Sequence, residues 1–92
     1  MNVVINDRHG GFGLSAEGMA LYLKLKGKEQ TCFSHEIPRN DPALIQVLLT
    51  LGERANDKYS RLKIVEIPDG ISYSISEYDG MEWIAESHRT WR

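Results

Sequence analysis

The residues that most clearly suggest ligand binding lie near the N-terminus. There the segment VVINDRHGGFGLSAEG contains Gly10, Gly11 and Gly13, followed by Ser15. A glycine-rich loop that leads into a helix presents backbone N–H groups and the positive end of the helix dipole. Successive N–H groups in such a loop can converge on an anion, and the Ser15 hydroxyl adds a donor. The loop therefore predicts a site for a small phosphorylated ligand such as a nucleotide.

A purely structural interpretation of the same loop stands beside the ligand-binding one. The stretch GGFG matches neither the dinucleotide fingerprint nor the phosphate-loop pattern. Ser15 is a good N-cap, and Glu17 complements the helix dipole and repels an anion. Phe12 either fills the edge of the core or offers a stacking surface. On the ligand-binding interpretation the site consists of Arg8, Gly10, Gly11, Phe12, Gly13, Ser15 and Arg89, with the arginines as charge partners.

Metal or acid–base chemistry has weaker support in this sequence. Cys32 and His35 have metal-ligand spacing but lack a second pair, so no metal site and no cofactor is predicted. The C-terminal third is acidic, and a small metal-dependent hydrolase is a third hypothesis for the function. It would use Glu77, Asp79, Glu86 and His88. A solvated acidic face, which includes Glu82, is the favoured interpretation of these residues.

Three aromatic residues indicate a different function, the binding of another protein. Tyr78, Trp83 and Trp91 are predicted interaction residues, and the chain ends in HRTWR. Tryptophan, tyrosine and arginine are the residues most enriched at binding hot spots.

Six predicted elements position these residues. Three apolar β-branched residues in 2–7 predict a short buried strand, and a helix over 16–26 lies between the Ser15 cap and Gly27. Residues 28–40 form a connection with a short extended piece at 31–33. Asp41-Pro42 opens a second helix that runs to about residue 55. Strands follow at 62–67 and 71–76, the second with one wet face formed by Ser72, Ser74 and Ser76.

The segment after Tyr78 allows two interpretations. Asp79-Gly80 favours a two-residue hairpin turn, with Met81, Trp83 and Ala85 alternating on a last strand. A short helix over EWIAESHR is the alternative, and the hairpin is preferred. The expected fold class is therefore α+β: one domain over 1–92, in the order β-α-α-β-β(-β), with two helices packed on a small mixed sheet.

The composition limits the class of protein. With 41% hydrophobic and 26% charged residues the chain resembles a soluble globular domain. Its net charge of −2 argues against general nucleic-acid binding. The lone Cys32, the lack of a signal-peptide pattern and the lack of an 18-residue apolar run predict a cytoplasmic protein that does not enter a membrane. A homodimer is predicted, because a second copy would cover an edge strand.

The ordered motifs VVIN…GGFGLS, EIPDG and EYDG.EWIAE.HRTW extend over nearly the whole chain. Together they resemble a group of small proteins of unassigned function encoded by tailed bacteriophages and prophages. The resemblance implies action in the cytoplasm of a host bacterium. It implies no particular activity, but small accessory phage proteins commonly act by binding, so the expected role is either sequestering a nucleotide signal or inhibiting a host defence protein. Arg8-His9 departs from the pattern of the group.

Overall fold

The structure is a computed structural model that describes residues 1–27 and 34–86. It has the α+β class and the element order that the sequence predicts. The elements are β1 (Asn2–Asn6), α1 (Ala16–Lys26), the 3-10 turn η1 (Ser34–Glu36), α2 (Pro42–Leu51), the 3-10 turn η2 (Gly52–Ala55), β2 (Leu62–Glu66), β3 (Tyr73–Tyr78) and β4 (Met81–Glu86). The predicted extended piece at 31–33 lies outside the described residues.

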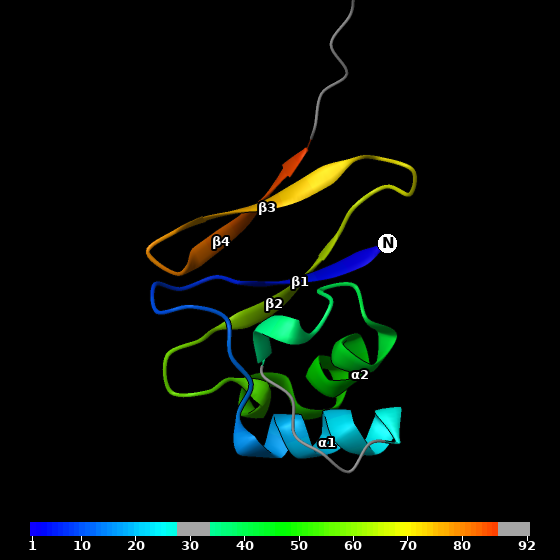
Figure 1. Ribbon diagram of the computed structural model, residues 1–92, viewed down its shortest axis with the longest axis vertical. Coiled ribbons are helices and arrows are strands. Elements are labelled where there is room, and N and C mark those ends of the chain that lie inside the picture. The colour runs from blue at the N-terminus through cyan, green and yellow to red at the C-terminus, as the bar shows by residue number, and fades with distance from the viewer. Residues whose placement is uncertain (28–33, 87–92) are drawn as a thin grey trace, which may run out of the picture.

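The strands form two antiparallel two-stranded sheets instead of one mixed sheet. β1 pairs with β2, with Val4 opposite Ile64, and β3 pairs with β4, with Ile75 opposite Ile84. Figure 1 shows three tiers: the β3–β4 hairpin, then β1 and β2, then α1 and α2. The difference arises because the hairpin packs across the free face of β1 and does not extend its sheet.

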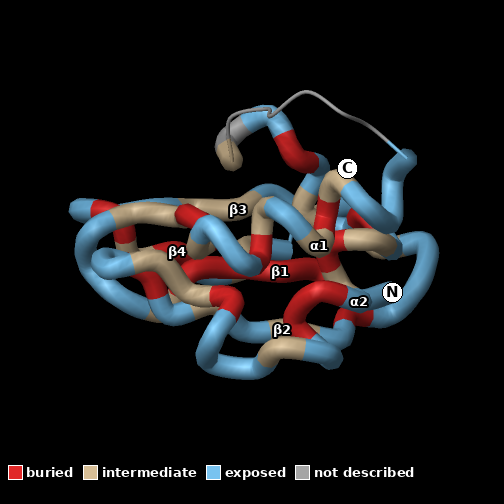
Figure 2. Tube along the Cα trace, turned by 90° about the horizontal axis from the view of Figure 1, so that it is seen from below, coloured by how far each residue is buried: buried red, intermediate tan, exposed pale blue. Residues whose placement is uncertain are grey.

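Strand β1 is buried along most of its length, as Figure 2 shows, because both of its faces are covered. Val4 packs into the cluster with α2, which includes Leu44. Val3 and Ile5 point the other way and meet Ile75 of the hairpin. A strand buried on both faces needs consecutive apolar residues, and this explains the run of β-branched side chains.

The helix boundaries follow the predicted caps, with one difference. Ser15 accepts a hydrogen bond from the Gly18 N–H, and Gly27 ends α1 in the left-handed conformation with φ 69°. Asp41 accepts one from the Ala43 N–H at 2.8 Å, and proline stands in the first turn of α2. The second helix ends at Leu51 and not near 55, because Gly52 adopts a φ of 58° and the chain continues as a 3-10 turn.

The last segment is the predicted hairpin and not a helix. Asp79 and Gly80 take positive φ angles of 51° and 89° in the two-residue turn. Met81, Trp83 and Ala85 then share one face of β4, and Glu82 and Ile84 share the other, which packs toward β1. The turn chemistry therefore fixes a register in which a glutamate points inward.

Candidate functional site

Two of the three glycines of the N-terminal loop lie where other parts of the chain approach closely, whereas a β-carbon at Gly11 would meet nothing within 4 Å. A β-carbon at Gly13 would overlap the Asp57 carboxylate, and one at Gly10 would lie 2.6 Å from the Tyr59 carbonyl oxygen. A β-carbon at Gly80, in the hairpin turn, would overlap the backbone of Gly10 and Gly11. The Gly10 N–H donates to the Asp79 carbonyl at 3.1 Å. The lack of a side chain at Gly80 thus lets the hairpin turn pack on the loop backbone, while Gly10 and Gly13 make room for Tyr59 and Asp57.

The hydroxyl of Ser15 has two partners in the structure. It accepts from the Gly18 N–H at 2.9 Å and donates to the Arg54 carbonyl at 2.6 Å. Arg54 in turn forms an exposed ion pair with Glu17 at 2.9 Å. These contacts give Ser15 the capping role of the structural interpretation.

Phe12 packs at the edge of the core and carries a cation on its ring. It contacts the buried cluster around α2. The guanidinium carbon of Arg39 lies 3.8 Å from the ring centroid. Phe12 therefore fills the core edge, and one of its faces is occupied by this cation–π contact.

Of the two arginines predicted to bind a phosphorylated ligand, the structure describes only Arg8. Arg8 is exposed, and its carbonyl accepts from the Asn6 side-chain amide at 2.6 Å. Arg89, Trp91 and His88 lie outside the described residues, as do Cys32 and the side chain of His35.

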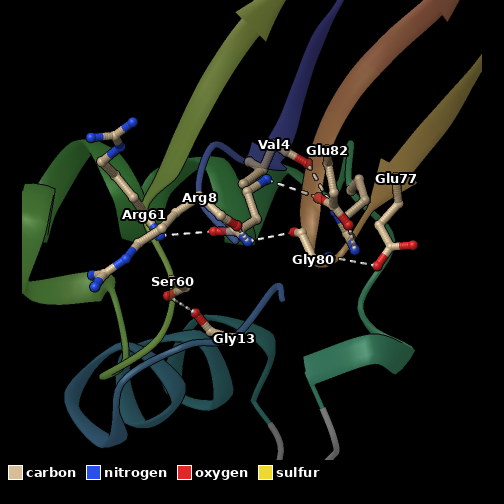
Figure 3. Close-up of polar contacts among 10 residues, drawn as sticks. Val4, Arg8, Gly13, Ser60, Arg61, Glu77, Gly80 and Glu82 are labelled. Atoms are coloured by element: carbon tan, nitrogen blue, oxygen red, sulfur yellow. Dashed lines mark hydrogen bonds and ion pairs between the residues drawn. The ribbon is translucent and has the colours of Figure 1, made fainter. Parts of the chain in front are cut away.

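A buried polar network joins β1 to the hairpin. Nothing in the sequence pattern predicts it. Asn6 is fully buried, and its amide nitrogen donates to the Gly80 carbonyl at 2.7 Å. Its amide oxygen accepts from the Arg61 N–H at 2.8 Å. Its own backbone N–H donates to Glu82 at 2.8 Å. Figure 3 shows these bonds converging between Arg8, Arg61, Gly80 and Glu82.

The charged part of this network is an ion pair between Glu82 and Arg39. The Glu82 side chain is 8% exposed and the Arg39 side chain 20% exposed. The guanidinium donates to both carboxylate oxygens, with Nη2 2.8 Å from Oε2. This fork geometry is the strong form of the contact. We call Asn6, Arg39, Gly80 and Glu82 the hairpin lock, because they fasten the hairpin to β1 and to the segment before α2.

The prediction of a solvated acidic face is wrong for Glu82 and is confirmed for the other three acidic residues. Glu77, Asp79 and Glu86 are exposed, whereas Glu82 is buried and paired. The Glu77 carboxylate accepts from the Gly80 N–H at 2.8 Å and so braces the turn. Within residues 1–27 and 34–86, no three carboxylate, histidine or cysteine side chains gather as they would around a metal ion.

A second polar cluster fixes α1 against the start of α2. Asp41 is buried and accepts from the Tyr22 hydroxyl at 2.8 Å and from the Lys26 ammonium at 3.2 Å. Burial alone raises the pKa of Asp41, but its bonds from Tyr22, the Ala43 N–H and Lys26, with the Lys26 charge, outweigh burial and lower the pKa below its usual value.

The outer face of the hairpin carries two exposed aromatic side chains. Tyr78 is 72% exposed and Trp83 is 47% exposed. Tyr78 stands directly opposite Met81, and Ser76 opposite Trp83. These three large side chains, Tyr78, Met81 and Trp83, share one face, which we call the aromatic face. The His9 ring meets Tyr78 edge-on, with the centroids 6.3 Å apart.

Comparison of the chain with protein-family models, with curated proteins and with solved structures gives no match. Among the described residues, none of the helices has the length and apolar character needed to cross a bilayer.

Proposed function

We propose that this protein acts by binding another protein through the aromatic face of the β3–β4 hairpin. The observation that carries the proposal is the placement of Tyr78, Met81 and Trp83 on one solvent-facing surface, with Tyr78 and Trp83 well exposed. Aromatic residues at the centre of an interface supply most of its binding free energy in typical complexes. Such exposure costs solubility, so it indicates a surface that becomes covered.

The support beneath the aromatic face favours binding. A two-stranded hairpin alone is marginal in water, yet this one rests on Val3 and Ile5 and is fastened by the hairpin lock. A rigid backbone reduces the ordering entropy that association must overcome. The face is therefore organised before a partner arrives.

The surroundings of the face define the charge of the partner. Asp79, in the turn next to Tyr78, is exposed, and the chain carries a net charge of −2. A partner with an apolar pocket rimmed by lysine or arginine would complement this surface. The resemblance to phage and prophage proteins makes a protein in the cytoplasm of the bacterial host, such as a defence protein, the expected partner, and inhibition the expected effect.

The test is capture from a bacterial lysate with matched variants. The wild-type protein is expected to retain a partner in stoichiometric amount, and the double variant Tyr78→Ala/Trp83→Ala is expected to lose it. Tyr59→Ala is the control, because Tyr59 is an aromatic residue that is 60% exposed and lies in the loop before β2, not on the hairpin. Retention by the double variant, or equal loss in the control, would contradict the proposal.

Binding of a nucleotide at the glycine loop is the competing function, and it makes a different prediction. Its phosphate would need the loop and Arg8, but the Asp57 carboxylate lies against Gly13 and Gly10 donates to Asp79. We expect nucleotides and cyclic nucleotides at millimolar concentration to leave the melting temperature unchanged. A ligand-dependent rise that Arg8→Ala abolishes would favour the nucleotide-binding function instead.

A further inference from the structure

The outer edge of β3 has no strand partner among the described residues. β3 pairs with β4 on one side only, in a sheet of two strands. The turn at 79–80 has two residues and closes on the pair Tyr78 and Met81. In such hairpins the closing pair is hydrogen-bonded, and hydrogen-bonded pairs then alternate along the ladder.

This alternation decides which backbone groups face outward. Tyr78, Ser76 and Ser74 direct their N–H and C=O groups toward β4, so Tyr73, Ile75 and Glu77 direct theirs toward the free edge. The edge therefore offers a short regular row of donors and acceptors for another antiparallel strand.

Strand β3 lacks the residues that usually prevent an edge strand from pairing with another chain. Its sequence, YSISEY, has one charged residue and no lysine or proline. β2 also lies at the edge of its own two-stranded sheet, but its five residues include Lys63 and Glu66, and such charges discourage strand addition. β3 is thus the strand edge better suited to pairing.

We propose that β3 pairs with β3 of a second copy of this chain, antiparallel about a twofold axis that passes at Ile75. The outward backbone groups then match, since Ile75 faces the partner's Ile75 and Tyr73 faces the partner's Glu77. On the outer face, Ser74 stands opposite the partner's Ser76. This register places no like charges opposite each other, and it gives Glu77 the Tyr73 hydroxyl of the other copy as a neighbour.

The dimer would join two hairpins into one four-stranded sheet. Because the twofold axis is perpendicular to that sheet, both aromatic faces lie on the same side. Tyr78, Met81 and Trp83 of one copy and those of the other then form one surface. Dimer formation does not rest on the proposed function, since the matching edge is present whether or not the aromatic face binds a partner.

Two serine pairs provide a register-specific test. Ser74 is exposed and Ser76 is half-buried, both on the outer face. Sedimentation velocity of the full chain should give twice the 10.5 kDa mass of one chain. In Ser74→Lys/Ser76→Lys, lysines face each other twice, and we expect the dimer dissociation constant to rise at least about tenfold. In Ser74→Lys/Ser76→Glu each lysine faces a glutamate, and the dimer should re-form.

The same register predicts exchange between variants. A mixture of the double-lysine variant with Ser74→Glu/Ser76→Glu should form a heterodimer, although each alone is monomeric, and circular dichroism checks that each is folded. A wild-type monomer at 100 μM (about the concentration at which weak dimers form) would overturn the proposal. Equal behaviour of the two Ser74→Lys variants, whether both are dimeric or both monomeric, would overturn this pairing.

Discussion

The ion pair in the hairpin lock supports a quantitative prediction. The Arg39 side chain is 20% exposed, and in Glu82→Ala its guanidinium loses the carboxylate with which it is paired. The variant also removes the acceptor of the Asn6 backbone N–H. Breaking a buried pair from one side typically costs about 3–5 kcal/mol. Because Arg39 keeps some contact with water, we expect about 3 kcal/mol, measured by urea denaturation. A domain of this size has roughly 5–14 kcal/mol in total, so the melting temperature should fall by more than about 12 °C.

A double-mutant cycle separates the ion pair from the other contacts. Arg39→Ala also loses the stacking on Phe12 at 3.8 Å, so it is destabilising by itself. The double variant Arg39→Ala/Glu82→Ala leaves no unpaired charge, and its cost should be smaller than the sum of the single costs by at least about 1 kcal/mol.

An exposed ion pair serves as the control for the cycle. Arg54 and Glu17 form a similar contact at 2.9 Å, but their side chains are 67% and 54% exposed. Arg54→Ala should cost less than about 1 kcal/mol. If Glu82→Ala is as mild as Arg54→Ala, or if the cycle is additive, the ion pair is solvated and does not fasten the hairpin.

The other predictions concern the loop contact, the pH dependence and the aromatic face. Gly80→Ala should destabilise the protein by at least about 2 kcal/mol more than Gly70→Ala, since both have positive φ but only Gly80 touches the loop backbone; equal melting temperatures would contradict this close approach. The difference in unfolding free energy between wild type and Asp41→Asn should be present at neutral pH. It should shrink as pH falls below about 4, because the lowered pKa of Asp41 stabilises the fold only while the carboxylate is ionised; a difference that grows on acidification would contradict the assignment. Trp83→Ala should lower stability by about 2 kcal/mol, roughly half the loss typical of a fully buried tryptophan, because nearly half of Trp83 is exposed; a loss of about 4 kcal/mol or more would make Trp83 a core residue.

The elements were predictable because their signals are local. Ser15 and Gly27 bracket α1, Asp41 opens α2, and Asp79-Gly80 has the backbone preference of a tight hairpin turn. Each of these signals acts within a few residues along the chain. Such signals depend little on the rest of the fold, so they can be interpreted from sequence alone.

The pairing of the strands and the hairpin lock were not predictable in the same way. Glu82 meets a guanidinium 43 positions away, and the Asn6 side chain meets a carbonyl 74 positions away. Alternation in β4 separates Trp83 from Glu82 but does not say which face is buried. The distant Arg39 and the Asn6 N–H make burial of Glu82 favourable, and no local pattern identifies these partners.

The glycine loop shows why one local signal supports two functions. Glycine permits a backbone N–H group to approach a phosphate, and it equally permits another stretch of backbone to approach. In this fold the second use is present at Gly10, which the Tyr59 carbonyl approaches, and at Gly80, where the hairpin turn packs on the backbone of the loop. A hydrogen bond from the Gly10 N–H to the Asp79 carbonyl joins the loop to this turn, which directly follows Tyr78. This bond and the hairpin lock therefore act on the same element, and both hold the aromatic face in position. Glu82→Ala should for this reason weaken partner binding even at temperatures where the variant stays folded, since the hairpin then has to be ordered on association.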